Sequence, residues 1–161
     1  MPVYLSFGSN IGDRLEHLRF AIRQFEIAEQ SSIYETEPVD FTDQPWFLNA
    51  VVAIRTDRTA RGLLEYIRDI EKSGGRTRDI AKGPRTIDID ILFFDNLIVD
   101  ESDLQIPHPR IPFRRFVLQP LAEIAADLIH PVLRKSIRQL ANECMDQSIV
   151  RRVGSHHVET E

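Results

Sequence analysis

The spacing of hydrophobic residues changes several times along the chain, and each spacing predicts a different element. The apolar run at residues 3–7 stops at a Gly-Ser-Asn turn, as a short strand would. Four apolar residues then recur at helical intervals: Leu15, Leu18, Ile22 and Phe25. This opening predicts a strand followed by an amphipathic helix that is capped by Asn10 or Asp13.

Strands and helices continue to alternate through the rest of the chain. β-branched or alternating stretches predict strands at 31–34, 49–55 and 86–94, and the spacing of Leu63, Leu64, Ile67 and Ile70 predicts a second helix. We expect a small hairpin with a strand near 97–99, an irregular proline-rich stretch at 106–113, and late helices at 116–125 and 136–142. The tail from about Gly154 is expected to fray.

This order of elements predicts the fold class. The pattern βαββαβ, followed by a hairpin and late helices, is that of an α+β, ferredoxin-like fold. We expect an antiparallel sheet with helices on one face, in a single domain that spans residues 1–161.

Composition narrows the class of protein. Hydrophobic residues make up 42% of the 161 residues, enough for one packed core. The formal charge of -5 disfavours a dedicated nucleic-acid binder, and no apolar run reaches the roughly 18–20 residues of a membrane span. Because the sequence has no signal-peptide pattern and a single cysteine, Cys144, we expect a cytoplasmic protein. We also expect a monomer that contacts neither nucleic acid nor membrane.

The basic residues point to a small anionic ligand. All but three of them are arginines, the exceptions being Lys72, Lys82 and Lys135. The planar guanidinium group matches the geometry of phosphate and carboxylate groups. Arg76, Arg78 and Arg85 lie in a polar stretch directly before the strand predicted at 86–94.

Asp88 and Asp90 carry the strongest local signal for chemistry. Residues two apart on a strand point to the same face, so their carboxylates would stand side by side while Ile87, Ile89 and Ile91 face the other way. Mg²⁺ prefers oxygen ligands and is often held by one or two carboxylates together with substrate phosphates. An edge strand with a solvated polar face explains the pair equally well, but the neighbouring arginines favour a site for phosphate chemistry.

Two further groups of residues have both a functional and a structural explanation. His108 lies between two prolines and could donate to a phosphate oxygen, although a lone loop histidine is more often structural. Phe47 and Asn49 could stack on and pair with a heteroaromatic ring, although an apolar strand entry explains them too. Neither a P-loop nor a Rossmann glycine motif is present.

Taken together, these motifs resemble one family, 6-hydroxymethyl-7,8-dihydropterin pyrophosphokinase of folate biosynthesis. The most specific string is Gly-Pro-Arg-Thr-x-Asp-x-Asp at 83–90, followed by Pro107-His108. Other matching segments are Gly8-Ser9-Asn10, Tyr34 to Val39, Asp43-Gln44-Pro45, Phe47-Leu48-Asn49, Ile70-Glu71, Gly75-Arg76, and Arg114 with Phe116. The resemblance covers about residues 3 to 130.

The resemblance implies an activity and a set of site residues. Such an enzyme moves pyrophosphate from ATP, its co-substrate, to the hydroxymethyl group of the pterin and releases AMP. Asp88 and Asp90 would bind two Mg²⁺ ions, and with Arg76 and Arg85 they would be the catalytic residues. ATP would be held by Arg76, Arg78, Arg85, His108 and Arg114. The pterin would be held by Gly8, Thr36, Val39, Phe47, Asn49 and Phe116.

The chain departs from the family pattern in a few places. Phe47 stands where a tyrosine is usual, and the loop between Arg78 and Gly83 is one residue short. Asp103 and Gln105 do not match the usual residues near the adenine, and nothing after about residue 131 matches well.

Two other functions are compatible with parts of the pattern. A two-metal phosphohydrolase or nucleotidyltransferase could use the same aspartates, but it would need further carboxylates near the metal. A ferredoxin-like binding module for RNA or a small effector would need aromatic residues on a basic sheet face, whereas Phe93 and Phe94 end an acidic strand here.

Overall fold

A six-stranded antiparallel sheet forms the centre of the protein. The computed structural model describes residues 2–39, 42–73 and 86–153. Its sheet has the order β5-β1-β4-β3-β8, and β2 also pairs with β4. The strands are β1 (Val3–Ser9), β2 (Glu26–Gln30), β3 (Tyr34–Thr36), β4 (Phe47–Arg55), β5 (Asp88–Phe94) and β8 (Val150–Arg152). The chain is therefore an α+β protein with an antiparallel sheet.

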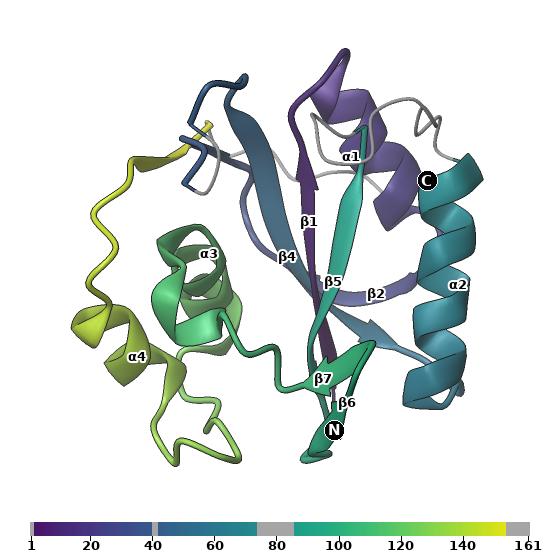
Figure 1. Cartoon of the computed structure of the whole chain (residues 1–161), viewed down its shortest axis with the longest axis vertical. Helices are drawn as coiled ribbons and strands as arrows, with labels where there is room; N and C mark the ends of the chain where they lie inside the picture. Colours follow the sequence, from purple (N-terminus) through teal and green to yellow (C-terminus); the bar gives the residue numbers. More distant parts are fainter. Residues whose placement is uncertain (1, 40–41, 74–85, 154–161) are drawn as a thin grey trace.

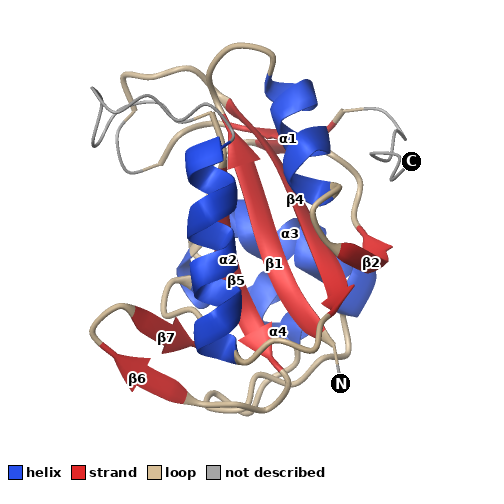
Figure 2. Ribbon diagram, turned by 90° about the vertical axis from the view of Figure 1, so that its right-hand side faces the viewer, coloured by secondary structure: helices blue, strands red, loops and turns tan. Residues whose placement is uncertain are grey.

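Helices cover both faces of this sheet (Figures 1 and 2). The helices α1 (Arg14–Ile22) and α2 (Ala60–Ser73) pack on one face, over a core that contains Leu5, Phe7 and Val52. The helices α3 (Arg115–Ala125) and α4 (Ile137–Glu143) pack on the other face. Because β4 lies between the two layers, seven of its nine residues are buried, and its sequence is apolar without interruption from Ala50 to Ile54.

The expectation of helices on one face is thus too narrow. It holds for α1 and α2, but α3 and α4 form a second layer on the opposite face. Apolar side chains on that face make the second layer favourable, because Tyr4, Val51, Ala53 and Phe93 would otherwise be exposed.

Local capping explains where the first two helices begin. Asp13, one of the two predicted caps, accepts a hydrogen bond from the backbone N–H of Glu16 at 3.2 Å. In α2 the buried residues Ala60, Leu63, Ile67 and Ile70 recur every three or four positions, and Thr59 Oγ1 accepts from Gly62 N at 3.0 Å. Both helices therefore begin where a side chain satisfies a free N–H group.

The strand predicted at 31–34 is wrong in its position. The structure has β2 before it and β3 at its end, with Ser31 and Ser32 buried between the two strands. Ser31 Oγ accepts from Val51 N and donates to Ser32 O, while Ser32 N donates to Glu123. These side-chain hydrogen bonds compete with the regular ladder and break the strand in two.

A small hairpin and a short 3₁₀ turn connect β5 to α3. The hairpin consists of β6 (Val99–Glu101) and β7 (Leu104–Ile106), so the strand predicted near 97–99 begins two residues later. Leu97 lies in the turn, where its N–H donates to Phe94 O. The 3₁₀ helix η1 (Ile111–Phe113) follows within the proline-rich stretch. None of the helices in the described ranges is long and apolar enough to cross a membrane.

Candidate active site

A cavity of about 180 Å³ lies between the sheet and the start of α3. It is bordered by β1, β3, β4 and β5 on the sheet side and by the beginning of α3 on the other. The lining residues are Ser6, Phe7, Gly8, Thr36, Glu37, Pro38, Val39, Gln44, Phe47, Asn49, Asp88, Asp90, Arg114 and Phe116. All six residues predicted to bind the pterin are among them, together with both aspartates and Arg114.

Strand register explains why these residues meet. Gly8 of β1 lies opposite Asp88 of β5 on one side and opposite Asn49 of β4 on the other. Ser6 lies opposite Asp90. Since partners in an antiparallel sheet point to the same face, the two aspartates and Asn49 share the face that α3 covers only in part.

Asp88 and Asp90 are half-buried and line the same cavity. Ile87, Ile89 and Ile91 are buried in the core on the opposite face, as the alternation predicts. The outer edge of β5 is also satisfied, because Ile89 N donates to Glu71 Oε2 at 3.1 Å and His108 N donates to Leu92 O at 3.0 Å. The strand that carries the carboxylates is therefore held on both edges.

The donor set of this pair fits Mg²⁺. Two carboxylates can supply only part of the six oxygen ligands of the ion, and substrate phosphates and water would supply the others. In the described part of the chain no cluster of three or more His, Cys, Asp or Glu side chains could hold a metal.

Asn49 presents a fixed amide at the base of the cavity. Its Nδ2 donates to Thr36 Oγ1 at 2.5 Å, and the residue is buried. A Cβ atom at Gly8 would lie 2.7 Å from Asn49 Oδ1, so only glycine leaves this amide its position. The close approach of Gly8 and Asn49 suits the edge of a flat polar ring.

Two aromatic residues border the cavity from different elements. Phe47 begins β4, and Phe116 lies in the first turn of α3. The Arg114 guanidinium lies 5.4 Å from the centre of the Phe116 ring, within cation–π range. The cavity therefore combines apolar ring faces with a positive charge and two carboxylates.

His108 lines a second cavity, of about 250 Å³, that shares Asp90 with the first. Its other walls come from α2 and the β6–β7 hairpin, including Leu64, Ile67 and Leu104. Burial, together with the positive charges of Arg114 and Arg110, lowers the pKa of His108 to about 4. His108 is therefore neutral at pH 7. Since its Nδ1 accepts from Arg110 N at 3.1 Å, its proton is on Nε2 and can be donated to an acceptor.

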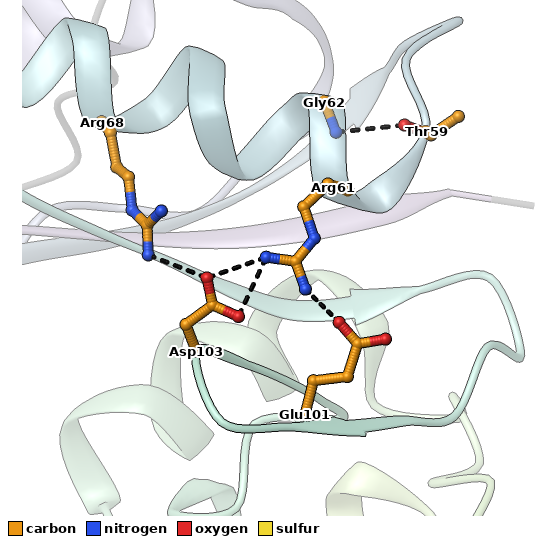
Figure 3. Close-up of polar contacts among 6 residues, drawn as sticks. All are labelled: Thr59, Arg61, Gly62, Arg68, Glu101 and Asp103. Atoms are coloured by element: carbon orange, nitrogen blue, oxygen red, sulfur yellow. Dashed lines mark hydrogen bonds and ion pairs between the residues drawn. The ribbon is translucent and has the colours of Figure 1, made fainter.

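An exposed group of ion pairs fastens the hairpin to α2 (Figure 3). Arg61 donates to both carboxylate oxygens of Asp103, at 2.9 and 2.8 Å, and also pairs with Glu101. Arg68 lies 3.4 Å from Asp103. Hydrogen bonds from Arg61 are the largest cause of the lowered pKa of Asp103. The Asp103 side chain is thus engaged with α2, and Gln105 likewise donates to Asp100 at 3.2 Å.

The structure brings together most, but not all, of the predicted site residues. Arg76, Arg78 and Arg85, together with the shortened loop between Arg78 and Gly83, lie outside the described residues. His108 and Arg114 reach the neighbourhood of Asp90 from two sides, since Arg114 lines the first cavity and His108 the second. The ligand assignments of all these residues stay predictions.

Several cavity residues were not expected from the sequence. Ser6, Glu37 and Gln44 line the first cavity. Ser6 could have been found from its period-two relation to Gly8. Gln44 accepts from Asn10 Nδ2 at 2.8 Å, and no local sequence pattern signals that contact.

Comparison with known proteins agrees with this geometry. The family model for 7,8-dihydro-6-hydroxymethylpterin-pyrophosphokinase matches residues 4–126. A relative from Bacillus subtilis, named 2-amino-4-hydroxy-6-hydroxymethyldihydropteridine pyrophosphokinase, is 46% identical over 127 residues, which cover 75% of this chain and 76% of the relative. The folic acid synthesis protein fol1 of Pneumocystis carinii is 41% identical over 152 residues, 91% of this chain.

The relatives differ widely in length. The match covers 20% of the Pneumocystis protein, so the chain spans about a fifth of that relative. A solved structure of Plasmodium falciparum HPPK-DHPS has the same fold, with a TM-score of 0.71 and 17% sequence identity, over 88% of this chain and 44% of that one. From the family match and the identities to its relatives, we conclude that the chain belongs to the 7,8-dihydro-6-hydroxymethylpterin-pyrophosphokinase family.

Proposed function

We propose that the chain transfers the β,γ-pyrophosphoryl group of MgATP to the hydroxymethyl oxygen of 6-hydroxymethyl-7,8-dihydropterin. The hydroxyl oxygen forms a bond to the β-phosphorus, the bond from that phosphorus to the α,β-bridging oxygen breaks, and AMP leaves. The hydroxyl proton is released to water or to a carboxylate. The observation that carries this proposal is the single cavity that holds both aspartates and all six predicted pterin contacts.

In this proposal the residues that line the cavity bind different parts of the two substrates. Asn49, held by Thr36, pairs with the polar edge of the pterin, and Phe47 and Phe116 cover its ring faces. Asp88 and Asp90 hold two Mg²⁺ ions, which would neutralise charge on the phosphates. Arg114 and the neutral His108 contact ATP phosphates, as Arg76, Arg78 and Arg85 are expected to do.

Catalysis of this transfer depends mainly on aligning the two substrates and on compensating the negative charge of the phosphates. Pyrophosphoryl transfer moves a highly charged group, so fixed cations and a fixed nucleophile supply most of the catalysis. The cavity meets this demand because Gly8 and Asn49 lie on strands adjacent to β5, which carries the aspartates.

Product analysis tests this function. We expect AMP to form from ATP only when the pterin alcohol and Mg²⁺ are both present, in a one-to-one ratio with the pterin diphosphate. AMP or inorganic phosphate formed at the same rate without the pterin would instead indicate a hydrolase.

The finer description of the fold belongs to the same proposal. With β2 and β3 counted as one interrupted strand, the order β5-β1-β4-β2 and the chain order βαββαβ are those of a ferredoxin-like fold. An RNA-binding module of that fold would need an open sheet face, whereas helices pack on both faces here. The ten described site residues line two cavities that share Asp90, and we propose a monomer in the cytoplasm.

A further inference from the structure

The segment of residues 146–152, which we call the C-terminal strap, runs from α4 past α3 to the edge of the sheet (Figure 1). At its far end β8 pairs with β3, with Val150 opposite Thr36. The pairing continues one step further, because Glu37 N donates to Ile149 O at 3.1 Å and Ile149 N donates to Glu37 Oε1 at 2.7 Å. Thr36 and Glu37 both line the first cavity. The strap therefore pairs with the β3 segment that forms one wall of that cavity.

The near end of the strap holds the opposite wall. Helix α3 has no side-chain cap of its own at Arg114 and no acidic residue in its first turn. Asp146 replaces the missing cap, since its Oδ2 accepts from Arg115 N at 3.0 Å and its Oδ1 accepts from Ser148 N at 2.9 Å. Arg115 Nη1 donates back to Ser148 O at 3.0 Å.

Asp146 is well suited to this task. Burial tends to raise the pKa of its carboxyl group, but the backbone hydrogen bonds from Ser148 and Arg115 outweigh burial and lower the pKa. The carboxylate thus stays charged at neutral pH, next to the positive end of the α3 dipole. This turn of α3 is also the one that presents Arg114 and Phe116 to the cavity.

We propose that the C-terminal strap is a positioning element for the pterin: it sets the distance between the β3 wall with Thr36 and the α3 wall with Phe116. The proposal rests on the function proposed above. Asp146 and Arg115 act through the walls that they join, because neither lines the first cavity. A ring held between two walls is sensitive to their spacing, so loosening the strap should weaken pterin binding first.

Two binding constants separate this role from general stabilisation. The variants are Asp146→Ala, which removes both acceptors, and Arg115→Gln, which removes the bond to Ser148 O. A matched control is Arg138→Gln, which breaks an exposed ion pair with Asp127 on the same side of the molecule. The dissociation constant of the pterin is measured in the presence of Mg²⁺ and a non-hydrolysable ATP analogue, and that of the analogue is measured alone.

Loss of a helix cap costs about 1 kcal/mol, and pterin binding would then have to order the uncapped turn of α3. We therefore expect Asp146→Ala to raise the dissociation constant of the pterin about fivefold or more. The dissociation constant of the ATP analogue should rise by a smaller factor in Asp146→Ala, because Arg114 is the one described ATP contact at this turn, and the control should change neither constant. Asp146→Asn keeps one acceptor oxygen, so it should lie between wild type and Asp146→Ala. If Asp146→Ala does not fold, Asp146→Asn and Arg115→Gln decide the matter.

Two outcomes would overturn the proposal. One is a pterin affinity unchanged in both Asp146 and Arg115 variants, and the other is an equal loss of affinity for both ligands. Failure of the proposed function looks different, because the wild-type chain would then not bind the pterin at all.

Discussion

Gly8→Ala is the smallest change that should disable the pterin pocket. A Cβ atom at this position would lie 2.7 Å from Asn49 Oδ1 and 3.6 Å from the Phe47 ring. The first distance is too short for a stable contact, and the asparagine cannot move easily because it is buried and bonded to Thr36. The added methyl group must therefore displace the amide or the strand.

The expected magnitude follows from the hydrogen bonds that Asn49 would lose. A buried polar edge of the ligand left without its partner costs about 1–3 kcal/mol, which corresponds to a roughly 5-fold to 150-fold rise in the dissociation constant. Binding of MgATP should change little, because the added Cβ would meet Asn49 and Phe47, and neither is expected to hold the nucleotide or Mg²⁺. The loss should appear as weaker pterin binding and not as weaker nucleotide binding.

Calorimetric titration with the pterin, in the presence of Mg²⁺ and a non-hydrolysable ATP analogue, checks this prediction. Gly62→Ala is a matched control in the first turn of α2, because its Cβ would meet only Thr59 Oγ1 at 3.2 Å and Arg58 Cβ at 3.9 Å. That control should bind both ligands as the wild type does. Wild-type pterin affinity in Gly8→Ala would refute the placement of the pterin edge at Asn49.

Three other predictions test the neighbouring residues. Asp90→Ala should reduce AMP formation by more than about tenfold, a barrier change of roughly 1.4 kcal/mol, and activity close to wild type at saturating Mg²⁺ would reject its metal role. Arg61→Gln should loosen the β6–β7 hairpin, which lines the cavity of the predicted ATP contact His108. It should therefore raise the dissociation constant of the ATP analogue and leave that of the pterin unchanged. An unchanged affinity for the analogue would contradict this. His108 is neutral when folded, with a pKa of about 4, and protonates near 6.5 when unfolded, so its contribution to stability is complete above about 6.5 and declines as the pH falls toward 4. Chemical denaturation should show that His108 lowers the free energy of unfolding at pH 4, relative to pH 7, by at most about 3 kcal/mol. His108→Gln should lack this part of the pH dependence. If the free energy of unfolding falls with pH in parallel for wild type and His108→Gln, the prediction is contradicted.

Local patterns predict the parts of the site that depend on one element. The alternation of Asp88 and Asp90 with three isoleucines is a property of a single strand, and the strand has that orientation in the structure. The buried stripe of α2 was likewise predictable from the spacing of Leu63, Ile67 and Ile70. Such features need no knowledge of distant contacts.

Features that depend on distant contacts could not be predicted in this way. The break at Ser32 depends on Glu123, 91 residues later, which accepts from its N–H and hydroxyl groups. The meeting of Gly8 with Asn49 depends on the register of two strands. The family resemblance placed both residues in the pterin site, but their spacing in the sequence alone did not.

The C-terminal strap is the clearest case of such a failure. Its strand is three residues long and has two exposed arginines, so it carries no periodic signal. It is held by partners far away in the sequence, such as Glu37 for Ile149 and Glu35 for Arg151. The family model ends at residue 126, yet residues beyond it complete one edge of the sheet beside the cavity.

In the proposed function, Asp88 and Asp90 bind metal in the same cavity that holds the pterin. Paramagnetic relaxation measures this directly, with Mn²⁺ in place of Mg²⁺ and a non-hydrolysable ATP analogue in the ternary complex. We predict strong broadening of the hydroxymethyl protons of the bound pterin, and its loss in Asp88→Asn/Asp90→Asn at equal pterin occupancy. Bound pterin without broadening in the wild-type protein, or equal broadening in the double variant, would contradict the shared site.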